Sequence, residues 1–230
     1  MTGRVVVVGG GIAGLAAAHA LRRDCPELTG LTVVDRARML GGKLRTSTIE
    51  GVPVDEGAEM FLAGVPEAVD LARAVGLGED LVHPVTSAAS VAVGGALRPL
   101  PAGTVLGVPG DLDALAASGV LTPAGLAEVR AEEASAGERV LDDVAVGELV
   151  RRRLGAQVLE RLVDPLLGGV YAGHADGLSL QATMPALAAA LGSPRSLVAA
   201  ARAARGTASG SPAFASLRGG LGGLVAALLA

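Results

Sequence analysis

The chain has 230 residues, of which 50% are hydrophobic and 18% charged, and its net charge is −4. This composition is typical of a globular protein with one large domain or two small ones, and it excludes a disordered chain. The acidic balance and the scarcity of aromatic residues (one Tyr, two Phe and no Trp) argue against a nucleic-acid partner. The lone Cys25 excludes an internal disulfide and a multi-cysteine zinc site.

The N-terminal stretch VVVVGGGIAGLAAAHALRR, residues 5–23, has three interpretations. It carries no formal charge before its last two residues, which suits a short membrane span, and its "AHA" suits the cleavage site of a secretory signal. The third interpretation is a strand, a glycine turn and a helix that hold a nucleotide. The four Val residues of 5–8 are typical of a strand buried on both faces, and Gly9, Gly11 and Gly14 then form G-x-G-x-x-G.

The sequence after the glycines favours the nucleotide interpretation. The Ala-rich segment 15–23 predicts a helix whose N-terminal N–H groups and dipole hold the phosphates. A second apolar run, LTVVD, ends at Asp35, 21 residues after Gly14, where an acid binds the ribose hydroxyls of an adenosine. A bilayer crossing needs about 20 apolar residues, so the uncharged stretch is also short for a span.

A second glycine-rich block follows, "RMLGGKLRT" and then "EGVPVDEGAEMF". It contains, in order, Gly41, Gly42, Lys43, Gly51, Asp55 and Gly57. This arrangement resembles the second fingerprint of the glycine-doublet flavoproteins, the superfamily of amine oxidases, phytoene desaturases and porphyrinogen oxidases, whose cofactor is FAD. A second backbone approach to the pyrophosphate clamps an extended dinucleotide. The resemblance therefore implies FAD rather than NAD; the alternative is two unrelated turns in a glycine-rich chain.

The two fingerprints together predict the cofactor contacts. These are Gly9, Gly10, Gly11, Ile12, Ala13 and Gly14 at the pyrophosphate, Asp35 and Arg36 at the adenosine ribose, Gly42 and Lys43 at the phosphates or the flavin side, and, by resemblance, Gly57, Ala58, Glu59 and Met60 near the isoalloxazine ring. Asp35 is shorter than the glutamate more usual in these flavoproteins, and its alternative role is that of an ordinary turn residue at a strand end. Lys43 stands where arginine is common, and either cation would serve.

Two further elements are predicted in the next part of the chain. Residues 66–76, PEAVDLARAVG, show the i, i+3, i+4, i+7 apolar spacing of an amphipathic helix, with Gly76 as its stop. Residues 90–101, SVAVGGALRPLP, predict a hairpin with Gly94 and Gly95 at the turn.

The middle of the chain predicts mainly helices. Thr122 and Pro123 are typical of an N-cap and a first-turn residue before the helical segment 124–133. Asp142 or Asp143 is the predicted cap of a longer helix carrying VGELVRRRLGAQVLERLV, and Pro165 is its predicted end. This part lacks a nucleotide fingerprint, so we expect a substrate domain inserted into an FAD domain.

Three later segments narrow the resemblance. They are RPLPAGTVLGVP, RRRLGAQVLERLVDPLLGGVYAGHADGLSLQATMPAL and SLRGGLGGLVAAL. In this order they resemble the porphyrinogen oxidases of haem biosynthesis. The resemblance implies an α/β fold, in which a Rossmann-like FAD-binding domain carries an inserted helix-rich substrate domain. The expected boundaries are 1–85 for the FAD domain, 86–212 for the substrate domain and 213–230 for the return to the FAD domain.

The resemblance also implies an activity. It is the FAD-dependent oxidation of a porphyrinogen, coproporphyrinogen III or protoporphyrinogen IX, to the porphyrin, with dioxygen as electron acceptor. Other glycine-doublet enzymes, such as carotenoid desaturases, remain the alternative within the superfamily. We expect a cytoplasmic protein; family members can sit on a membrane surface, and the sequence neither requires nor excludes that contact. The sequence leaves the oligomeric state and the choice between the two porphyrinogens open.

No catalytic residue or metal ligand is identified by the sequence. His19 is expected in the first helix, His83 at a turn before a proline, and His174 in a loop. Arginines such as Arg98 and the run 151–153 could pair with substrate propionates, but a charge run on a helix is more often solvated. Porphyrinogen oxidases of this kind are about twice as long as this chain. We therefore expect truncation before the C-terminal half, and a chain that by itself binds FAD weakly and turns over little, or a non-catalytic remnant of the fold.

Overall fold

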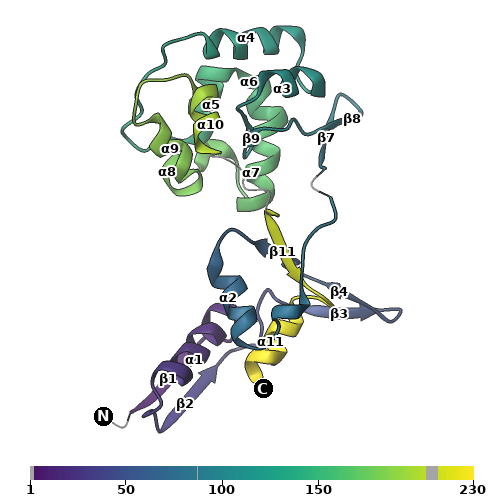
Figure 1. Ribbon diagram of the computed structural model, residues 1–230, viewed down its shortest axis with the longest axis vertical. Helices are drawn as coiled ribbons and strands as arrows, with labels where there is room; N and C mark the ends of the chain where they lie inside the picture. Colours follow the sequence, from purple (N-terminus) through teal and green to yellow (C-terminus); the bar gives the residue numbers. More distant parts are fainter. Residues whose placement is uncertain (1–2, 87, 206–211) are drawn as a thin grey trace. The chain divides into compact units, whose positions relative to one another are not determined.

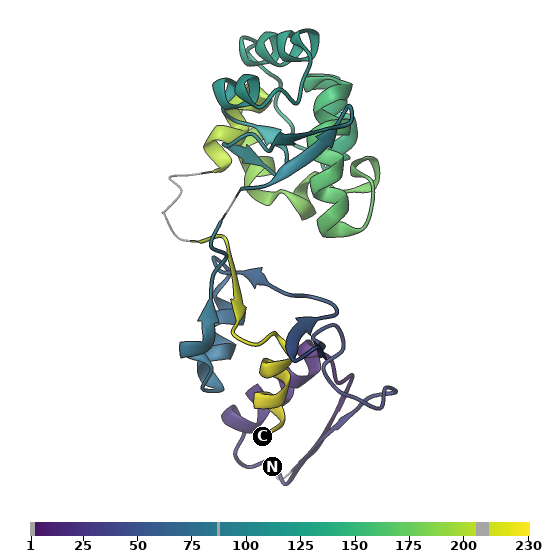
Figure 2. The ribbon, with the colours of Figure 1, turned by 90° about the vertical axis from the view of Figure 1, so that its right-hand side faces the viewer.

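The computed structural model describes residues 3–86, 88–205 and 212–230, which form two compact units (Figure 1). One unit contains 3–86 together with 212–230, and the other contains 88–205. The first unit mixes strands and helices, whereas the second is mainly helical (Figures 1 and 2). The expected α/β fold class is confirmed.

The first unit begins with the predicted strand, glycine turn and helix. These are β1 (Arg4–Val8) and α1 (Ile12–Asp24), followed by β2 (Gly30–Val34). Strand β2 pairs in parallel with β1, and its last residue, Val34, lies opposite Val8. The predicted strand, glycine turn and helix of residues 5–23 are thus confirmed, and their binding of a nucleotide stays a prediction. No helix in the described part of the chain combines the length and the apolarity that a membrane crossing requires.

The rest of the first unit consists of short antiparallel pairs and two helices. Its elements are β3 (Thr46–Ile49), β4 (Val52–Asp55), β5 (Phe61–Leu62), α2 (Pro66–Ala74), η1 (Gly78–Asp80), β6 (Leu81–Val82), β11 (Phe214–Leu217) and α11 (Gly222–Leu229). Strands β3 and β4 form a hairpin, while β11 lies between β5 and β6 and pairs antiparallel with both. Strand β11 and helix α11 come from the far end of the sequence, so this end of the chain is an integral part of the first unit.

Burial in the first unit differs from the sequence-based expectation for β1. Exposed and half-buried side chains alternate along the strand, and Val6 and Val8 are 59% and 85% exposed. The expectation of a strand buried on both faces is therefore wrong for this chain. Helix α1 packs on the β1–β2 sheet, but no second layer in the described residues covers Val6 and Val8. The buried hydrophobic residues described in the first unit are few: Ala72, Leu217, Leu221 and Leu224 form one cluster, and Leu15, Ala215 and Val225 are buried as well.

The second unit surrounds one continuous hydrophobic core. Its elements are β7 (Ser90–Val93), β8 (Ala96–Pro99), β9 (Thr104–Val105), β10 (Val108–Pro109), α3 (Leu112–Ser118), α4 (Pro123–Glu133), α5 (Val146–Leu154), α6 (Ala156–Val158), η2 (Leu159–Val163), α7 (Asp164–Tyr171), η3 (Ala175–Gly177), α8 (Leu180–Thr183), α9 (Pro185–Leu191) and α10 (Leu197–Ala204). Leu149, Leu162 and Leu191 are at most 1% exposed and represent this core.

Several local predictions are confirmed. Helix α2 begins at Pro66 and ends before Gly76, whose φ of +83° is the left-handed conformation that glycine adopts at a helix end. Strands β7 and β8 form the predicted hairpin, and positive φ at both Gly94 and Gly95 gives the turn the twist of its strands. The Thr122 hydroxyl accepts a hydrogen bond from the N–H group of residue 125 at 3.2 Å and so caps α4.

The predicted cap of the following helix is wrong. Helix α5 begins after Ala145, without a side-chain cap from Asp142 or Asp143. Instead, the Asp143 carboxylate accepts a hydrogen bond from the Gln181 N–H group at 3.0 Å, in the first turn of α8. A hydrogen bond with Ser179 and the one from Gln181 lower the pKa of Asp143. The capping residue type was recognised, but tertiary folding brings it to a helix 38 residues away.

The predicted helix end at Pro165 is also wrong. The helix ends earlier, at Leu154, and is followed by Gly155, whose φ is +85°. Helical structure then continues from Ala156 through the π-helical turn η2 and across Pro165 to Tyr171. In an α-helix a proline removes one hydrogen bond and its ring clashes with the carbonyl group four residues earlier. The wider π-helical turn directly before Pro165 provides room for the ring, so the helix persists.

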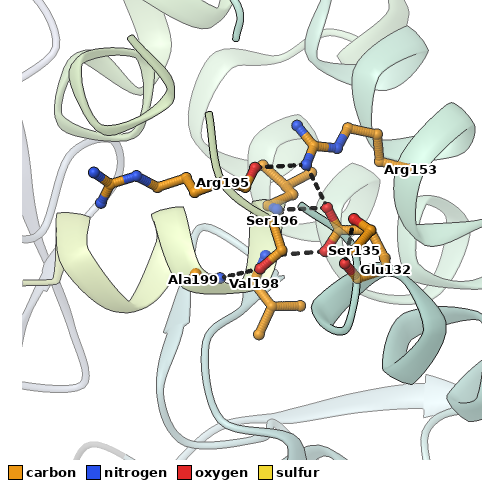
Figure 3. A network of polar contacts seen from close by, with 8 residues as sticks. Glu132, Ser135, Arg153, Arg195, Ser196, Val198 and Ala199 are labelled. Atoms are coloured by element: carbon orange, nitrogen blue, oxygen red, sulfur yellow. Dashed lines mark hydrogen bonds and ion pairs between the residues drawn. The ribbon is translucent and has the colours of Figure 1, made fainter. Parts of the chain in front are cut away.

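A buried ion pair joins three helices of the second unit (Figure 3). An Nη2 atom of Arg153 on α5 lies 2.6 Å from Oε1 of Glu132 on α4, and both side chains are less than one-tenth exposed. The Glu132 carboxylate also accepts hydrogen bonds from the N–H groups of Leu197 and Val198, at 2.5 and 3.3 Å, in the first turn of α10. Arg153 donates a second bond to the carbonyl oxygen of Arg195 at 2.8 Å. Glu132 therefore acts as an interior cap that aligns α10 with α4 and α5.

Candidate cofactor-binding site

The first glycine turn has the geometry of an anion cradle. Gly9 has a φ of +110°, and its N–H group donates to the carbonyl oxygen of Val34 at 2.7 Å, which fixes the turn to the end of β2. A side chain on Gly14 would overlap the carbonyl oxygen of Gly9, so only glycine fits in this turn of α1. Helix α1 starts at Ile12 with no side-chain cap at Gly11 and no acidic residue in its first turn. Its first N–H groups are therefore available to an anion.

The glycine-doublet loop lies directly against the first turn. The Gly41 N–H group donates to the carbonyl oxygen of Gly10 at 2.7 Å, and Gly11 forms a parallel β-bridge with Gly41. A Cβ atom on Gly42 would lie 3.1 Å from the Cα atom of Gly11. The backbones of the two fingerprints therefore meet at positions without side chains. Lys43 follows on the exposed surface and takes part in none of the ion pairs found among the described residues.

The segment Gly57–Met60 joins the same group through the backbone. The Lys43 carbonyl oxygen accepts from the Ala58 N–H group at 3.2 Å, and a side chain on Gly57 would overlap that oxygen. The Glu59 carbonyl oxygen accepts from the Ser216 hydroxyl at 2.6 Å, which links the segment to β11. Met60, the last residue of this segment, is 40% exposed.

Asp35 stands at the end of β2 and binds the glycine turn itself. Its two carboxylate oxygens accept hydrogen bonds from the N–H groups of Ala37 at 2.6 Å and Gly10 at 2.7 Å. These two bonds lower the pKa of Asp35, so its carboxylate stays ionised at a pH where an ordinary aspartate is protonated. The bond to Ala37 is the Asx-turn expected of a strand-end turn residue. A carboxylate has about four acceptor positions, so a ribose hydroxyl can still bind. Arg36 is exposed beside it.

The residues present fit FAD. Two glycine backbones in contact, an uncapped helix N-terminus and the cation Lys43 are the features that a pyrophosphate needs. A cavity of about 470 Å³ adjoins the doublet loop, and its wall includes Met39, Gly42, Thr46 and Val225. The structure thus brings the predicted contacts of the first and second fingerprints into one continuous group; their role as FAD contacts stays a prediction.

The second unit brings no catalytic constellation together in the described residues. The His174 side chain is 92% exposed and its Nδ1 atom lies 4.0 Å from Asp164, the geometry of a loop residue. Of the arginine run, Arg151 pairs with Asp176 at 2.8 Å and Arg153 with Glu132, so both have structural partners.

The first unit adds contacts that the sequence did not identify. Nδ1 of His83 lies 2.8 Å from the carbonyl oxygen of Phe214 and joins the end of β6 to β11. Ser216 binds the backbone of Glu59, whereas Thr46 and Asp55 bind N–H groups at the start of α11; none of the three is among the predicted cofactor contacts. The two-residue turn between β3 and β4 is the signal that could have shown Thr46 opposite Asp55.

The chain matches the model of the flavin containing amine oxidoreductases over residues 12–230. The chain belongs to this family. FAD is the cofactor of this family, as the resemblance of the two fingerprints implied.

Relatives of this chain carry a more specific name than the family does. The chain is 34% identical to a coproporphyrinogen III oxidase of Bacillus subtilis, over 94% of this chain and 46% of the relative. It is 41% identical to a coproporphyrinogen III oxidase of Mycobacterium bovis over 93% of this chain and 47% of the relative. The chain thus spans about half the length of these curated relatives.

Solved structures agree with the family assignment. A crystal structure from Exiguobacterium sp. 255-15, which bears the name protoporphyrinogen oxidase as an unproven assignment, is 38% identical with a TM-score of 0.86. The match covers 100% of this chain and 50% of that one. A reduced UDP-galactopyranose mutase, at 18% identity and a TM-score of 0.62, shares the fold alone.

Proposed function

We propose that this chain is the N-terminal half of an FAD-dependent porphyrinogen oxidase, which converts coproporphyrinogen III or protoporphyrinogen IX to the porphyrin in haem biosynthesis, with dioxygen as electron acceptor. The observation that carries this proposal is the 34–41% identity to coproporphyrinogen III oxidases over 93–94% of the chain. The match includes the helical unit as well as the glycine fingerprints. The fingerprints alone would not distinguish this activity, because other glycine-doublet enzymes also have them.

Each part of the first unit has a role in this proposal. The turn of residues 9–14 and the N-terminus of α1 hold the pyrophosphate, and Lys43 adds a positive charge beside it. Asp35 binds a ribose hydroxyl through the acceptor positions that its two backbone bonds leave unused. Residues 57–60 would contact the isoalloxazine ring of bound FAD. When bound, the flavin supplies the redox chemistry.

The second unit contributes substrate binding in this proposal. Its interior is filled by its own side chains, so a porphyrinogen must bind on its surface. Val170 and Tyr171, at the end of α7, are 65% and 43% exposed and offer an apolar surface to a tetrapyrrole. Orientation of the substrate, rather than acid or base catalysis, is the role that we assign to this unit.

The extent of the match limits what these 230 residues do by themselves. They correspond to 46–47% of the curated relatives, so about half of the relatives' length has no counterpart in these residues. We therefore expect weak FAD binding and slow turnover by this chain without a complement. A remnant that binds flavin without turnover is the second candidate, favoured by the same coverage.

The test uses the purified chain with added FAD under anaerobic conditions. Coproporphyrinogen III and then protoporphyrinogen IX are added, and the loss of oxidised-flavin absorbance is followed. Air is admitted afterwards and porphyrin fluorescence is measured. Porphyrinogens oxidise in air by themselves, so controls without protein and with the Gly14→Ala variant are required.

The outcomes separate the two candidates. Bleaching that depends on substrate, followed by fluorescence above both controls, supports the oxidase and shows which porphyrinogen is preferred. Bound flavin that is not bleached by either porphyrinogen supports the remnant. No binding in an equilibrium titration with FAD up to millimolar concentration contradicts both.

A further inference from the structure

A pair of polar side chains on the β3–β4 hairpin binds the start of helix α11. Glu50 and Gly51, both with positive φ, form the two-residue turn of the hairpin, and the register then places Thr46 opposite Asp55. The Thr46 hydroxyl donates to Oδ1 of Asp55 at 2.5 Å. Asp55 belongs to the second glycine-rich fingerprint, but none of the predicted cofactor contacts includes it.

The pair accepts hydrogen bonds from two N–H groups at the N-terminus of α11. Both carboxylate oxygens of Asp55 lie 3.1 Å from the Leu221 nitrogen, and Oγ1 of Thr46 lies 2.8 Å from the Gly222 nitrogen. Helix α11 has no cap from its own N-cap residue. Its first N–H groups would otherwise lack a partner, so the hairpin supplies the cap from 166 and 176 residues away in the sequence.

Gly220 and Gly222, at the start of α11, lie close to the side chains of Thr46 and Asp55. A Cβ atom on Gly220 would lie 2.7 Å from the Thr46 side chain and 2.8 Å from Oδ1 of Asp55. A Cβ atom on Gly222 would lie 2.7 Å from Oγ1 of Thr46. The segment "RGGLGG" is therefore shaped for contact with this hairpin, and we call Thr46 and Asp55 the hairpin clasp.

The contacts continue from α11 to the predicted cofactor loops. A Cβ atom on Gly41 would lie 3.1 Å from a methyl group of Val225 on α11, and Leu44 packs against the buried cluster that includes Leu221 and Leu224. The Gly41 N–H group in turn binds Gly10. Thr46, Gly222 and Val225 also line the cavity beside the doublet loop.

We propose that the hairpin clasp is a positioning device for the cofactor: by fixing the start of α11, Thr46 and Asp55 hold the glycine-doublet loop against the first glycine turn. The proposal deepens the proposed function and rests on it for the identity of the cofactor. Neither side chain needs to touch FAD; both act through Val225 and the backbone of residues 41–45. Three acceptor contacts from one charged and one hydroxyl group link the hairpin to the start of α11.

The test compares Thr46→Val and Asp55→Asn with Thr46→Ser and a control, Thr48→Val. Thr48 lies on the same strand, is exposed and is outside the clasp. Hydrogen exchange of the full chain is read by mass spectrometry at two places, peptides covering 219–225 and peptides covering 41–45. FAD affinity is measured separately by quenching of flavin fluorescence.

We expect Thr46→Val and Asp55→Asn to accelerate exchange about tenfold at both places, because each removes or mispairs an acceptor of a partly buried N–H group. FAD affinity should weaken by a similar factor, while Thr46→Ser restores both and Thr48→Val changes neither. Faster exchange confined to 219–225 would show a local cap only and overturn the proposal. Unchanged exchange at 219–225 would show that the clasp is absent in solution. Failure of the wild-type chain to bind FAD would contradict the proposed function, and exchange at 41–45 would still decide whether the clasp positions the loop.

Discussion

The two units differ in how much of their own apolar surface they bury. The helical unit, residues 88–205, encloses side chains such as Leu162 completely and aligns three helices through the Glu132–Arg153 pair. The first unit buries only a small cluster, and Val8 remains 85% exposed. Glycine turns, uncapped N–H groups and backbone contacts dominate the first unit instead. The first unit thus leaves backbone groups and apolar side chains open, whereas the second is stabilised by its own core.

The largest effect is expected for the interior ion pair of the helical unit. Glu132→Gln should lower the free energy of unfolding by about 3–5 kcal/mol, because Arg153 would remain buried without a counter-charge. Glu133→Gln is the matched control: Glu133 pairs with Arg202 near the surface, and its loss should cost about 1 kcal/mol or less. Urea unfolding followed by circular dichroism measures both. Equal effects for the two variants would show that the interior network is not a principal source of stability.

Truncation of apolar side chains sharpens the contrast between the units. Leu162→Ala should cost about 2–5 kcal/mol, since the removed atoms leave a cavity in a closed core. Val8→Ala, on the open face of β1, should change stability by no more than about 0.5 kcal/mol. The same urea titration applies, with the two transitions analysed separately if the units unfold independently. A large cost at Val8 would mean that its face is covered in solution.

The affinity for FAD is expected to depend on the first glycine turn. Gly14→Ala should weaken FAD binding at least about tenfold, because the new side chain would overlap the Gly9 carbonyl oxygen and displace the turn. Gly64→Ala, in the same unit, meets no atom within 4 Å and should leave the affinity unchanged. Equilibrium titration of FAD with each variant measures this effect. If Gly14→Ala binds FAD as tightly as wild type, the turn is not the pyrophosphate site.

The smallest effect concerns the pH dependence of the first turn. The Gly10 and Ala37 bonds lower the pKa of Asp35, so the stability that its carboxylate gives to the turn is present above the ordinary aspartate pKa and is lost only as the pH falls through the lower, folded value. NMR titration of the Asp35 carboxyl carbon should therefore give a lower midpoint in the folded chain than in a peptide of residues 31–39. Equal midpoints would show that the two backbone bonds do not persist in solution.

The sequence predicted those features that depend on neighbouring residues. A β-branched run, a glycine turn and an Ala-rich helix need no distant partner to be recognised, nor does a hairpin with Gly94 and Gly95 at its turn. Thr122 before Pro123 caps the helix that follows it for the same reason. The predicted cofactor contacts also come from two short fingerprints, and the structure brings these into backbone contact at Gly10 and Gly41.

Features that depend on distant partners could not be predicted in this way. Asp143 has the right chemistry for a helix cap, but only folding decides that it binds α8 rather than α5. Pro165 ends a helix by the local rule, and only the π-helical turn before it removes the steric conflict.

For this protein, the amino-acid sequence by itself determined the flavoprotein fingerprints, the α/β class and most local turns, because steric and capping preferences act within a few residues. Only the tertiary structure decided that Asp55 and Thr46 cap α11, that Glu132 and Arg153 form an interior pair, and that Val6 and Val8 remain exposed. These contacts join residues up to 176 positions apart, and burial is a property of everything that packs around a side chain rather than of the side chain's own neighbours in sequence.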